Sequence, residues 1–177
     1  LLSRSSTLGF AREFSFARPD FKTSGLVVVI AIAAILPVEA FSSVFERMWG
    51  PDADYTSFIL SIKPKGPASF AFVAIGIVLV AAVTEELLFR GFIQRIFQRN
   101  MSGPLAVVLA GILFSLAHFN PPMIPGTAAL GVLFGYFFYR TGSLWYPIAG
   151  HAIYNLTMLV RLDAATEEEI VAAKIVP

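Results

Sequence analysis

Long runs of apolar residues, separated by short polar segments, dominate the sequence. Four stretches lack Asp, Glu, Lys and Arg altogether, namely 23–38, 66–84, 100–139 and 141–160. A helix that crosses the hydrocarbon core needs about 20 mostly apolar residues. Proline, asparagine and glycine between positions 120 and 126 divide the third stretch into two helices with a turn. The pattern predicts an all-α, polytopic transmembrane helical bundle of about five membrane helices, at 24–46, 67–98, 103–119, 126–140 and 143–161.

Three segments lie outside this predicted transmembrane domain of residues 24–161. Residues 1–23 form a juxtamembrane arm with four basic residues, and residues 162–177 form an acidic, weakly helical tail. Residues 47–65 contain Pro51, Asp52, Asp54 and Pro64 and are therefore predicted to be a loop. Lys and Arg are more frequent in the segments that would lie on the N-terminal side, by eight to five, which favours a cytoplasmic N-terminus.

Composition supports a membrane protein and excludes several kinds of site. The chain is 56% hydrophobic and only 14% charged, whereas soluble domains carry about 25% charged residues. No basic run with interleaved aromatic residues is present, so we expect no nucleic-acid partner. The absence of cysteine excludes disulfides, thiolate catalysis and cysteine metal sites. The expected partners are the lipid bilayer and a substrate that lies in it or on it.

Ionisable residues inside the apolar stretches are few. Between residues 66 and 160 the only acids are Glu85 and Glu86, and the only histidines of the chain are His118 and His151. An ionisable group in a membrane costs several kcal/mol unless it is paired or hydrated, so each one is a candidate functional residue. Glu39, near the end of the first helix, is instead interpreted as a residue that reaches the interface or packs there.

The spacing of the polar residues predicts which side chains meet. Glu86 and Arg90 are four residues apart, so they can pair on one helix face. Glu85 is rotated from Glu86 by about 100° and faces a different neighbour. His151 and Asn155 also share one face. Because lipid-facing charge is costly, we expect all these groups to line a common cavity inside the bundle.

Together these residue types are suited to hydrolysis. A carboxylate in a water-poor cavity is a usable base, and a neighbouring histidine can help to hold a water molecule. A second histidine with an asparagine amide can donate hydrogen bonds to a developing oxyanion. Ser115, near His118, is a second candidate nucleophile, but no elbow motif surrounds it. The alternative is that the ion pair and the histidines only hold helices together.

Three short motifs resemble those of the CaaX protease and bacteriocin-processing (CPBP, Abi) family of intramembrane peptidases. Residues 85–90 read Glu-Glu-Leu-Leu-Phe-Arg and resemble its EExxxR motif. Residues 114–118 resemble its FxxxH motif, and residues 151–155 its HxxxN motif. The run from 131 to 145 is similar to the family's usual approach to the third motif. The resemblance covers residues 67–160, with all three motifs in order on hydrophobic helices.

The resemblance implies a function and a role for each motif residue. The family's peptidases act on membrane-associated proteins, some of them prenylated. By motif match, Glu85 would be the general base on water, and His118 would assist it. The other residues would have supporting roles, with an oxyanion site at His151 and Asn155 and a geometry held by Glu86 and Arg90. The glutamate-activated water needs no cofactor.

Several alternatives remain beside this interpretation. A non-catalytic bacteriocin-immunity or scaffold protein could share the fold, although a pure binder would not need both glutamates. A small transporter or proton relay could also use buried Glu and His. A zinc hydrolase could take Glu85, His118 and His151 as ligands, but the HExxH signature is absent. The expected substrate is a membrane-associated peptide or protein, lipidated or not, and the expected location is a bacterial plasma membrane, with several membrane passes.

Overall fold

The protein is described by a computed structural model that covers residues 15–49 and 53–173. Within these residues every regular element is a helix, which confirms the predicted all-α class. The elements outside the long central helix are α2 (Phe21–Trp49), α3 (Ala53–Ile62), α7 (Gly103–Leu116), the 3-10 turn η3 (Pro121–Met123), α8 (Ile124–Thr141), α9 (Trp145–Ala164) and α10 (Glu167–Ala173).

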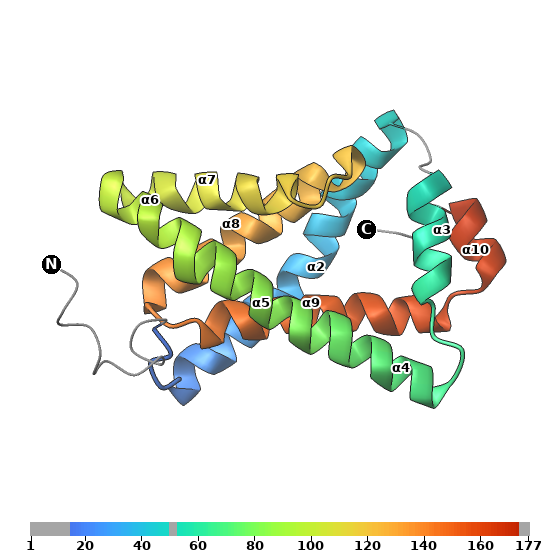
Figure 1. Cartoon of the computed structure of the whole chain (residues 1–177), viewed down its shortest axis with the longest axis horizontal. Coiled ribbons are helices and arrows are strands. Elements are labelled where there is room, and N and C mark those ends of the chain that lie inside the picture. The colour runs from blue at the N-terminus through green and yellow to red at the C-terminus, as the bar shows by residue number, and fades with distance from the viewer. Residues whose placement is uncertain (1–14, 50–52, 174–177) are drawn as a thin grey trace, which may run out of the picture.

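The central helix runs without a break from Pro67 to Asn100 and crosses the molecule diagonally in Figure 1. Two π-helical stretches flank the short α-helical segment that carries the two glutamates. Such π-helical turns are frequent at functional sites. The successive segments are α4 (Pro67–Ala74), η1 (Ile75–Ala81), α5 (Ala82–Glu86), η2 (Leu87–Gln94) and α6 (Arg95–Asn100).

Within the described residues, five helical rods form the body of the bundle, close to the five predicted ranges. In Figure 1, α2, the central helix, α7, α8 and α9 run alternately toward one end of the molecule and back. Helices α3 and α10 pack against each other at the end where α9 finishes. The α6–α7 and α8–α9 connections lie at the opposite end.

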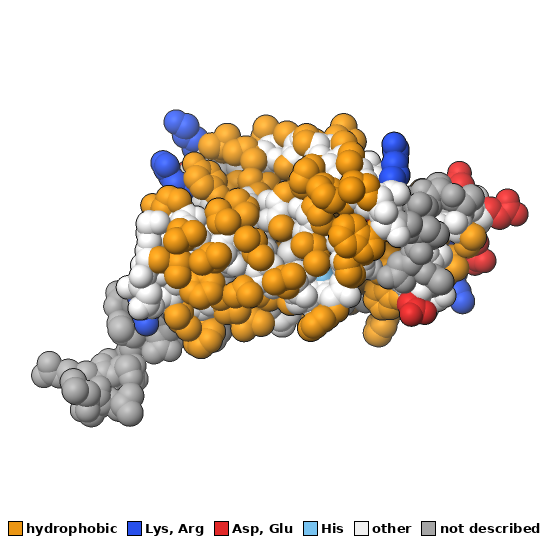
Figure 2. All heavy atoms as spheres, turned by 90° about the horizontal axis from the view of Figure 1, so that it is seen from above, with side chains coloured by type: hydrophobic (Ala, Val, Ile, Leu, Met, Phe, Trp, Pro, Cys, Tyr) orange, Lys and Arg blue, Asp and Glu red, His pale blue; other side chains and the backbone are white. Residues whose placement is uncertain are grey.

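Length and composition make this chain an integral membrane protein. Among the described residues, three helices are long and apolar enough to cross a membrane, namely Phe21–Trp49, Pro67–Asn100 and Pro121–Thr141. Helix α7 is apolar but has 14 residues, and α9 has 20 residues but is less apolar, because His151, Asn155 and Thr157 interrupt it. Figure 2 shows a face covered by hydrophobic side chains, with charged side chains gathered toward the two ends.

Glycines bring α7 and α8 into close contact. A Cβ atom on Gly131 would lie 2.8 Å from the Cα atom of Gly111, and a Cβ on Gly111 would lie 2.7 Å from the backbone nitrogen of Val132. Small residues at such positions let helix backbones approach each other in membranes. Beside this contact, the core is filled by buried side chains from α2, α8 and α9, including Val27, Leu130, Phe134, Phe137 and Tyr146.

The structure corrects two predicted boundaries. Residues 53–62, predicted as part of a loop, form α3, because Tyr55, Phe58, Ile59 and Ile62 follow helical spacing and place apolar groups on one face. The third predicted helix was too long, since α7 ends at Leu116 rather than at residue 119. The predicted arm of residues 1–23 lies largely outside the described residues.

Candidate active site

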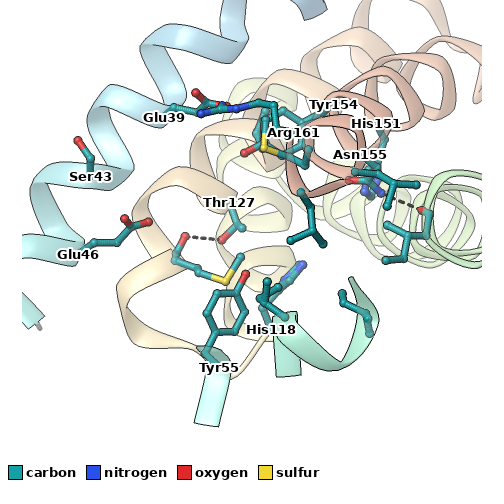
Figure 3. A pocket seen from close by; sticks show the side chains of 18 of the residues that line it. Glu39, Ser43, Glu46, Tyr55, His118, Thr127, His151, Tyr154, Asn155 and Arg161 are labelled. Atoms are coloured by element: carbon teal, nitrogen blue, oxygen red, sulfur yellow. Dashed lines mark hydrogen bonds and ion pairs between the residues drawn. The ribbon is translucent and has the colours of Figure 1, made fainter. Parts of the chain in front are cut away.

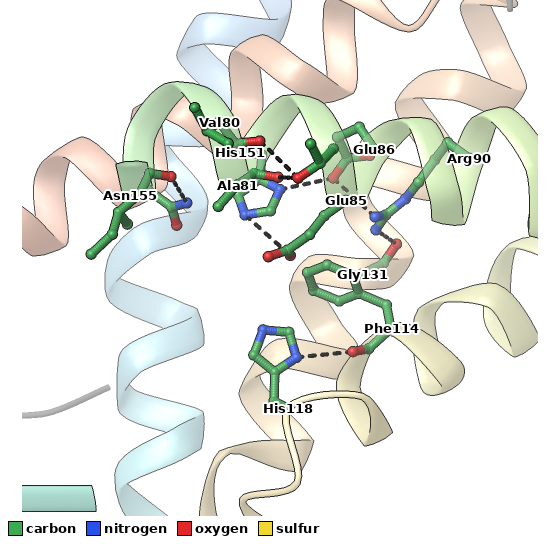
Figure 4. A network of polar contacts seen from close by, with 12 residues as sticks. Val80, Ala81, Glu85, Glu86, Arg90, Phe114, His118, Gly131, His151 and Asn155 are labelled. Carbon is green, nitrogen blue, oxygen red and sulfur yellow. Dashed lines mark hydrogen bonds and ion pairs between the residues drawn. The ribbon is translucent and has the colours of Figure 1, made fainter. Parts of the chain in front are cut away.

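One oxygen of Glu86 joins two helices. Glu86 is fully buried in α5, and its Oε1 atom accepts a hydrogen bond from Nη1 of Arg90 at 2.9 Å. The same oxygen lies 2.9 Å from Nδ1 of His151 in α9. Figure 4 shows these contacts on either side of the carboxylate. The predicted ion pair between Glu86 and Arg90 is therefore confirmed, and a buried histidine completes it.

Arg90 extends this contact to α8. Its guanidinium is fully buried, and Nη2 donates to the backbone carbonyl of Gly131 at 2.9 Å. The guanidinium also lies over the rings of Phe114 and Phe134, with its carbon 4.6 Å and 5.8 Å from the ring centroids. Cation–π contacts of this kind stabilise a desolvated arginine. Arg90 thus fixes Glu86 relative to α7 and α8.

Glu85 has a different environment from its neighbour. Its side chain is 33% exposed, and its Oε2 atom lies 4.0 Å from Nε2 of His151. That separation is longer than a direct hydrogen bond. The predicted divergence of the two glutamates is confirmed: Arg90 pairs with Glu86, whereas the carboxylate of Glu85 remains accessible beside the imidazole.

His151 is held between aromatic rings as well as between carboxylates. Its ring stacks on Phe134 with centroids 5.2 Å apart and an interplanar angle of 18°, and it meets the edge of Phe114 at 5.8 Å. Because Nδ1 faces the carboxylate of Glu86, that nitrogen carries the hydrogen. The other ring nitrogen, Nε2, is the one that lies near the carboxylate of Glu85.

His118 lies in the turn after α7, so its predicted place within a helix of residues 103–119 is wrong. Its Nδ1 lies 2.9 Å from the backbone oxygen of Phe114, so this nitrogen is the donor and Nε2 is left to accept. The ring also contacts Phe114 edge-on at 5.0 Å. The residue is exposed, whereas His151 is buried. Phe114 touches both imidazoles and connects their positions.

Asn155 stands one turn after His151 and faces the same cavity, as its spacing predicted. Its Nδ2 donates to the backbone oxygen of Ile77, in the first π-helical stretch, at 2.9 Å. A primary amide has two N–H donors, so one of them is engaged by the central helix. Asn155 therefore links α9 to the segment that precedes the glutamates.

A cavity of about 630 Å³ extends from His118, His151 and Asn155 toward α2 and α3. Glu85, Glu86 and Arg90 are not among its lining residues, so the predicted cavity common to all six residues is wrong for these three. Glu86 and Arg90 are completely buried by their own contacts, and Glu85 lies beside His151.

His118, His151 and Asn155 line one part of the cavity, and Glu39, Ser43 and Glu46 of α2 line another, as Figure 3 shows. Glu39 forms an ion pair with Arg161 of α9, a role that the sequence interpretation did not foresee. Apolar side chains form most of the remaining wall, including Leu36, Ile59, Leu130 and Phe134.

Two residues in the region have structural environments that the sequence did not reveal. Ser115 is fully buried and donates to the backbone oxygen of Ile124, with the hydroxyl of Thr127 at 2.7 Å; it ties α7 to α8. Gln94 is also fully buried and donates to the backbone oxygen of Gly135 at 2.9 Å. A possible signal for Gln94 was its position four residues after Arg90 on the same face.

The described residues contain no group of three His, Asp or Glu side chains close enough to hold a metal ion. A zinc site at Glu85, His118 and His151 would require these side chains to move closer together, because zinc ligands lie about 2.0–2.2 Å from the metal.

Comparisons with known proteins agree with the three motifs. Residues 67–157 match the family model described as type II CAAX prenyl endopeptidase Rce1-like. The uncharacterized protein YyaK of Bacillus subtilis (strain 168) is 37% identical over 92 residues, which cover 47% of this chain and 31% of that relative. The aligned part thus spans about a third of the relative's length. No solved structure matches the chain. The matched segment holds all six motif residues and just over half of the sequence, and the chain belongs to the Rce1-like family of type II CAAX prenyl endopeptidases.

Proposed function

We propose that the protein is an intramembrane endopeptidase that hydrolyses a peptide bond through a water molecule activated by Glu85. Family membership supports peptidase activity in general. The observation that carries the specific mechanism is the unequal environment of the adjacent glutamates. Glu86 is buried and bonded to Arg90 and His151, whereas Glu85 is one-third exposed at the edge of the site.

In the proposed reaction, Glu85 takes a proton from water as the water oxygen attacks the peptide carbonyl carbon. The carbonyl oxygen becomes a negatively charged oxyanion in the tetrahedral intermediate. Glu85 then returns the proton to the amide nitrogen as the C–N bond breaks, which leaves a carboxylic acid and an amine. A positioned acid–base group of this type accelerates proton transfer by about 10²–10⁴-fold.

His118 and His151 have different tasks in this mechanism. Nε2 of His118 is left as an acceptor by the contact of Nδ1 with Phe114, so it can hold the attacking water in place. His151 is tied through Nδ1 to Glu86 and presents Nε2 beside Glu85. A proton on Nε2 would stabilise the Glu85 carboxylate before the attack and the oxyanion after it.

Asn155 supplies the other part of the proposed oxyanion site. One of its amide hydrogens is directed to Ile77, and this bond fixes the orientation of the amide plane. The second hydrogen can donate to the developing oxyanion. Loss of a single donor of this kind lowers kcat by about 10²–10³-fold in other hydrolases.

The proposed substrate is a membrane-associated peptide or protein, and the proposed location is a bacterial plasma membrane. The cavity has a mostly apolar wall, with polar groups at His118, His151 and Asn155 and along α2. An extended peptide segment with apolar side chains fits such a lining. A relative from Bacillus subtilis supports the bacterial location.

The direct test compares the N- and C-termini of all membrane proteins in three membrane preparations. The preparations contain the wild-type protein, the Glu85→Gln variant or the Glu167→Gln variant. The Glu167→Gln variant makes the same chemical change at an exposed position in α10. We expect new termini with wild type and with Glu167→Gln, and none with Glu85→Gln. Identical termini in all three samples would overturn the peptidase proposal and favour a non-catalytic binding protein of the same fold.

A further inference from the structure

Gln94 occupies a place that packing alone does not explain. It lies one turn beyond Arg90 on the face of the central helix that also carries Glu86. Its side chain is completely buried, and Nε2 donates to the backbone oxygen of Gly135 at 2.9 Å. Its Oε1 atom is buried and has no hydrogen-bond partner among residues 15–49 and 53–173. A buried amide oxygen without a partner destabilises a protein.

The contact of Gln94 repeats the contact of Arg90 one turn further along both helices. Arg90 donates to the carbonyl of Gly131, and Gln94 donates to the carbonyl of Gly135. Each pair is separated by 41 residues in the sequence. Two hydrogen bonds of the same register therefore join α8 to the central helix, one turn apart.

Glycine at position 135 leaves room for this arrangement. A Cβ atom there would lie 2.8 Å from Oε1 of Gln94 and 3.3 Å from Cγ1 of Val107. Any larger residue would therefore push the amide of Gln94 away from the helix. The glycine at position 135 thus allows α8 to lie close to Gln94. This contact is one turn away from the hydrogen bond between Arg90 and Gly131.

We propose that Gln94 is a positioning residue for the peptidase site. By holding Gly135, it keeps the carbonyl of Gly131 in line with Arg90, and Arg90 in turn orients the oxygen of Glu86 that binds His151. The inference rests on the proposed function of Glu85 and His151. Gln94 touches neither substrate nor water; it acts through Arg90.

Replacement of Gln94 by methionine tests this role. Methionine has a similar length and volume, fills the same space and cannot donate to Gly135. It also removes the unpaired buried oxygen, so we expect an unchanged or higher melting temperature in detergent. The matched control is Gln98→Met, the same change one turn later in α6, where the side chain is only partly buried.

The first readout does not depend on activity. The chain has two histidines, so ¹⁵N-labelled imidazoles give two sets of ring resonances that a His118→Gln variant assigns. We expect Gln94→Met to shift the Nδ1 resonance of His151 and to leave those of His118 unchanged. Gly135→Ala should cause the same shift from the opposite side of the contact, and it serves as the test if Gln94→Met does not fold.

The second readout is cleavage of an internally quenched peptide that carries the sequence identified by the comparison of membrane termini. For Gln94→Met we expect kcat to fall about tenfold with KM unchanged, a factor that equals the loss of about 1.4 kcal/mol of transition-state stabilisation. Gln98→Met should behave like wild type. Unchanged His151 resonances in both Gln94→Met and Gly135→Ala would overturn the positioning role. If wild-type protein cleaves nothing while the resonances shift as expected, the proposed function fails and the structural link from Gln94 to His151 stands.

Discussion

Nδ1 of His151 lies 2.9 Å from Oε1 of Glu86, the same oxygen that accepts a hydrogen bond from Arg90. One carboxylate oxygen thereby receives a donor from its own helix and a donor from α9, 65 residues later in the sequence. Because Glu86 is fully buried, neither donor competes with bulk water. This oxygen places His151 beside Glu85 and so connects the stability of the bundle to the proposed chemistry.

The buried pair should be essential for folding. Removing one partner of a buried ion pair costs about 3–5 kcal/mol, because the other charge is left without compensation. We therefore expect Glu86→Gln and Arg90→Ala to lower both the folded yield and the melting temperature in detergent. Full stability of both variants would show that Glu86 and Arg90 do not hold the helices together.

Glu85→Gln should separate chemistry from folding. Residue 89, four positions after Glu85, is phenylalanine, and the side chain of Glu85 is partly exposed. The variant should therefore melt within a few degrees of wild type and lose cleavage completely. Thermal unfolding and cleavage are measured on the same preparation. A cleaving Glu85→Gln together with a stable but inactive Glu86→Gln would reverse the roles of the two glutamates.

The contact between α7 and α8 predicts an effect of a single methyl group. A Cβ at Gly131 would lie 2.8 Å from the Cα and O atoms of Gly111, so Gly131→Ala should destabilise the protein by about 1–3 kcal/mol through overpacking. Gly76→Ala is the control, since its Cβ would meet nothing within 4 Å. Alanine there should leave stability unchanged or raise it slightly. Equal melting temperatures for the two variants would contradict the close packing.

Metal dependence is decided by elemental analysis of active, purified protein. The proposed base acts on water without a Lewis acid, so we expect no stoichiometric zinc and undiminished cleavage after dialysis against a chelator. The control is the same protein dialysed with zinc added back. Stoichiometric zinc whose removal abolishes cleavage, and whose return restores it, would replace the mechanism by metal-assisted hydrolysis.

The start of α2 predicts a dependence of stability on pH. Oδ1 of Asp20 accepts the backbone N–H of Thr23 at 2.9 Å, and Oδ2 accepts the hydroxyl of Tyr146 at 3.0 Å. Hydrogen bonding from Thr23, first through its side chain and then through its backbone, lowers the pKa of Asp20 below its ordinary value of 3.8. The carboxylate therefore stabilises the fold above that value, and this contribution is lost as the pH falls through the lower pKa of the folded state.

Melting temperatures of wild type and Asp20→Asn check this expectation. Wild type should be more stable near neutral pH, and the difference should shrink once the pH falls below 3.8. Because Asp20 is exposed, the difference should be small. A gap that is the same at every pH would mean that the charge of Asp20 contributes nothing.

Local physics made much of this protein predictable from its sequence. Apolar stretches of about 20 residues indicate membrane helices whatever surrounds them. The polar residues between these stretches indicate where each helix begins and ends. The contact of Glu86 with Arg90 is also local, because a four-residue spacing brings the two side chains together on any helix. The helix α3 was missed because prolines and aspartates at its borders outweighed its short apolar face.

The tertiary structure decided everything that depends on residues far apart in the chain. That His151 binds Glu86, that Arg90 reaches the carbonyl of Gly131 and that Asn155 reaches Ile77 follows from the register in which helices pack. The sequence by itself determined the helices, their pairs at four-residue spacing and the family motifs. It did not determine which carboxylate takes the histidine, because hydrophobic periodicity specifies the face that a helix buries but not how far it slides or turns against its neighbour.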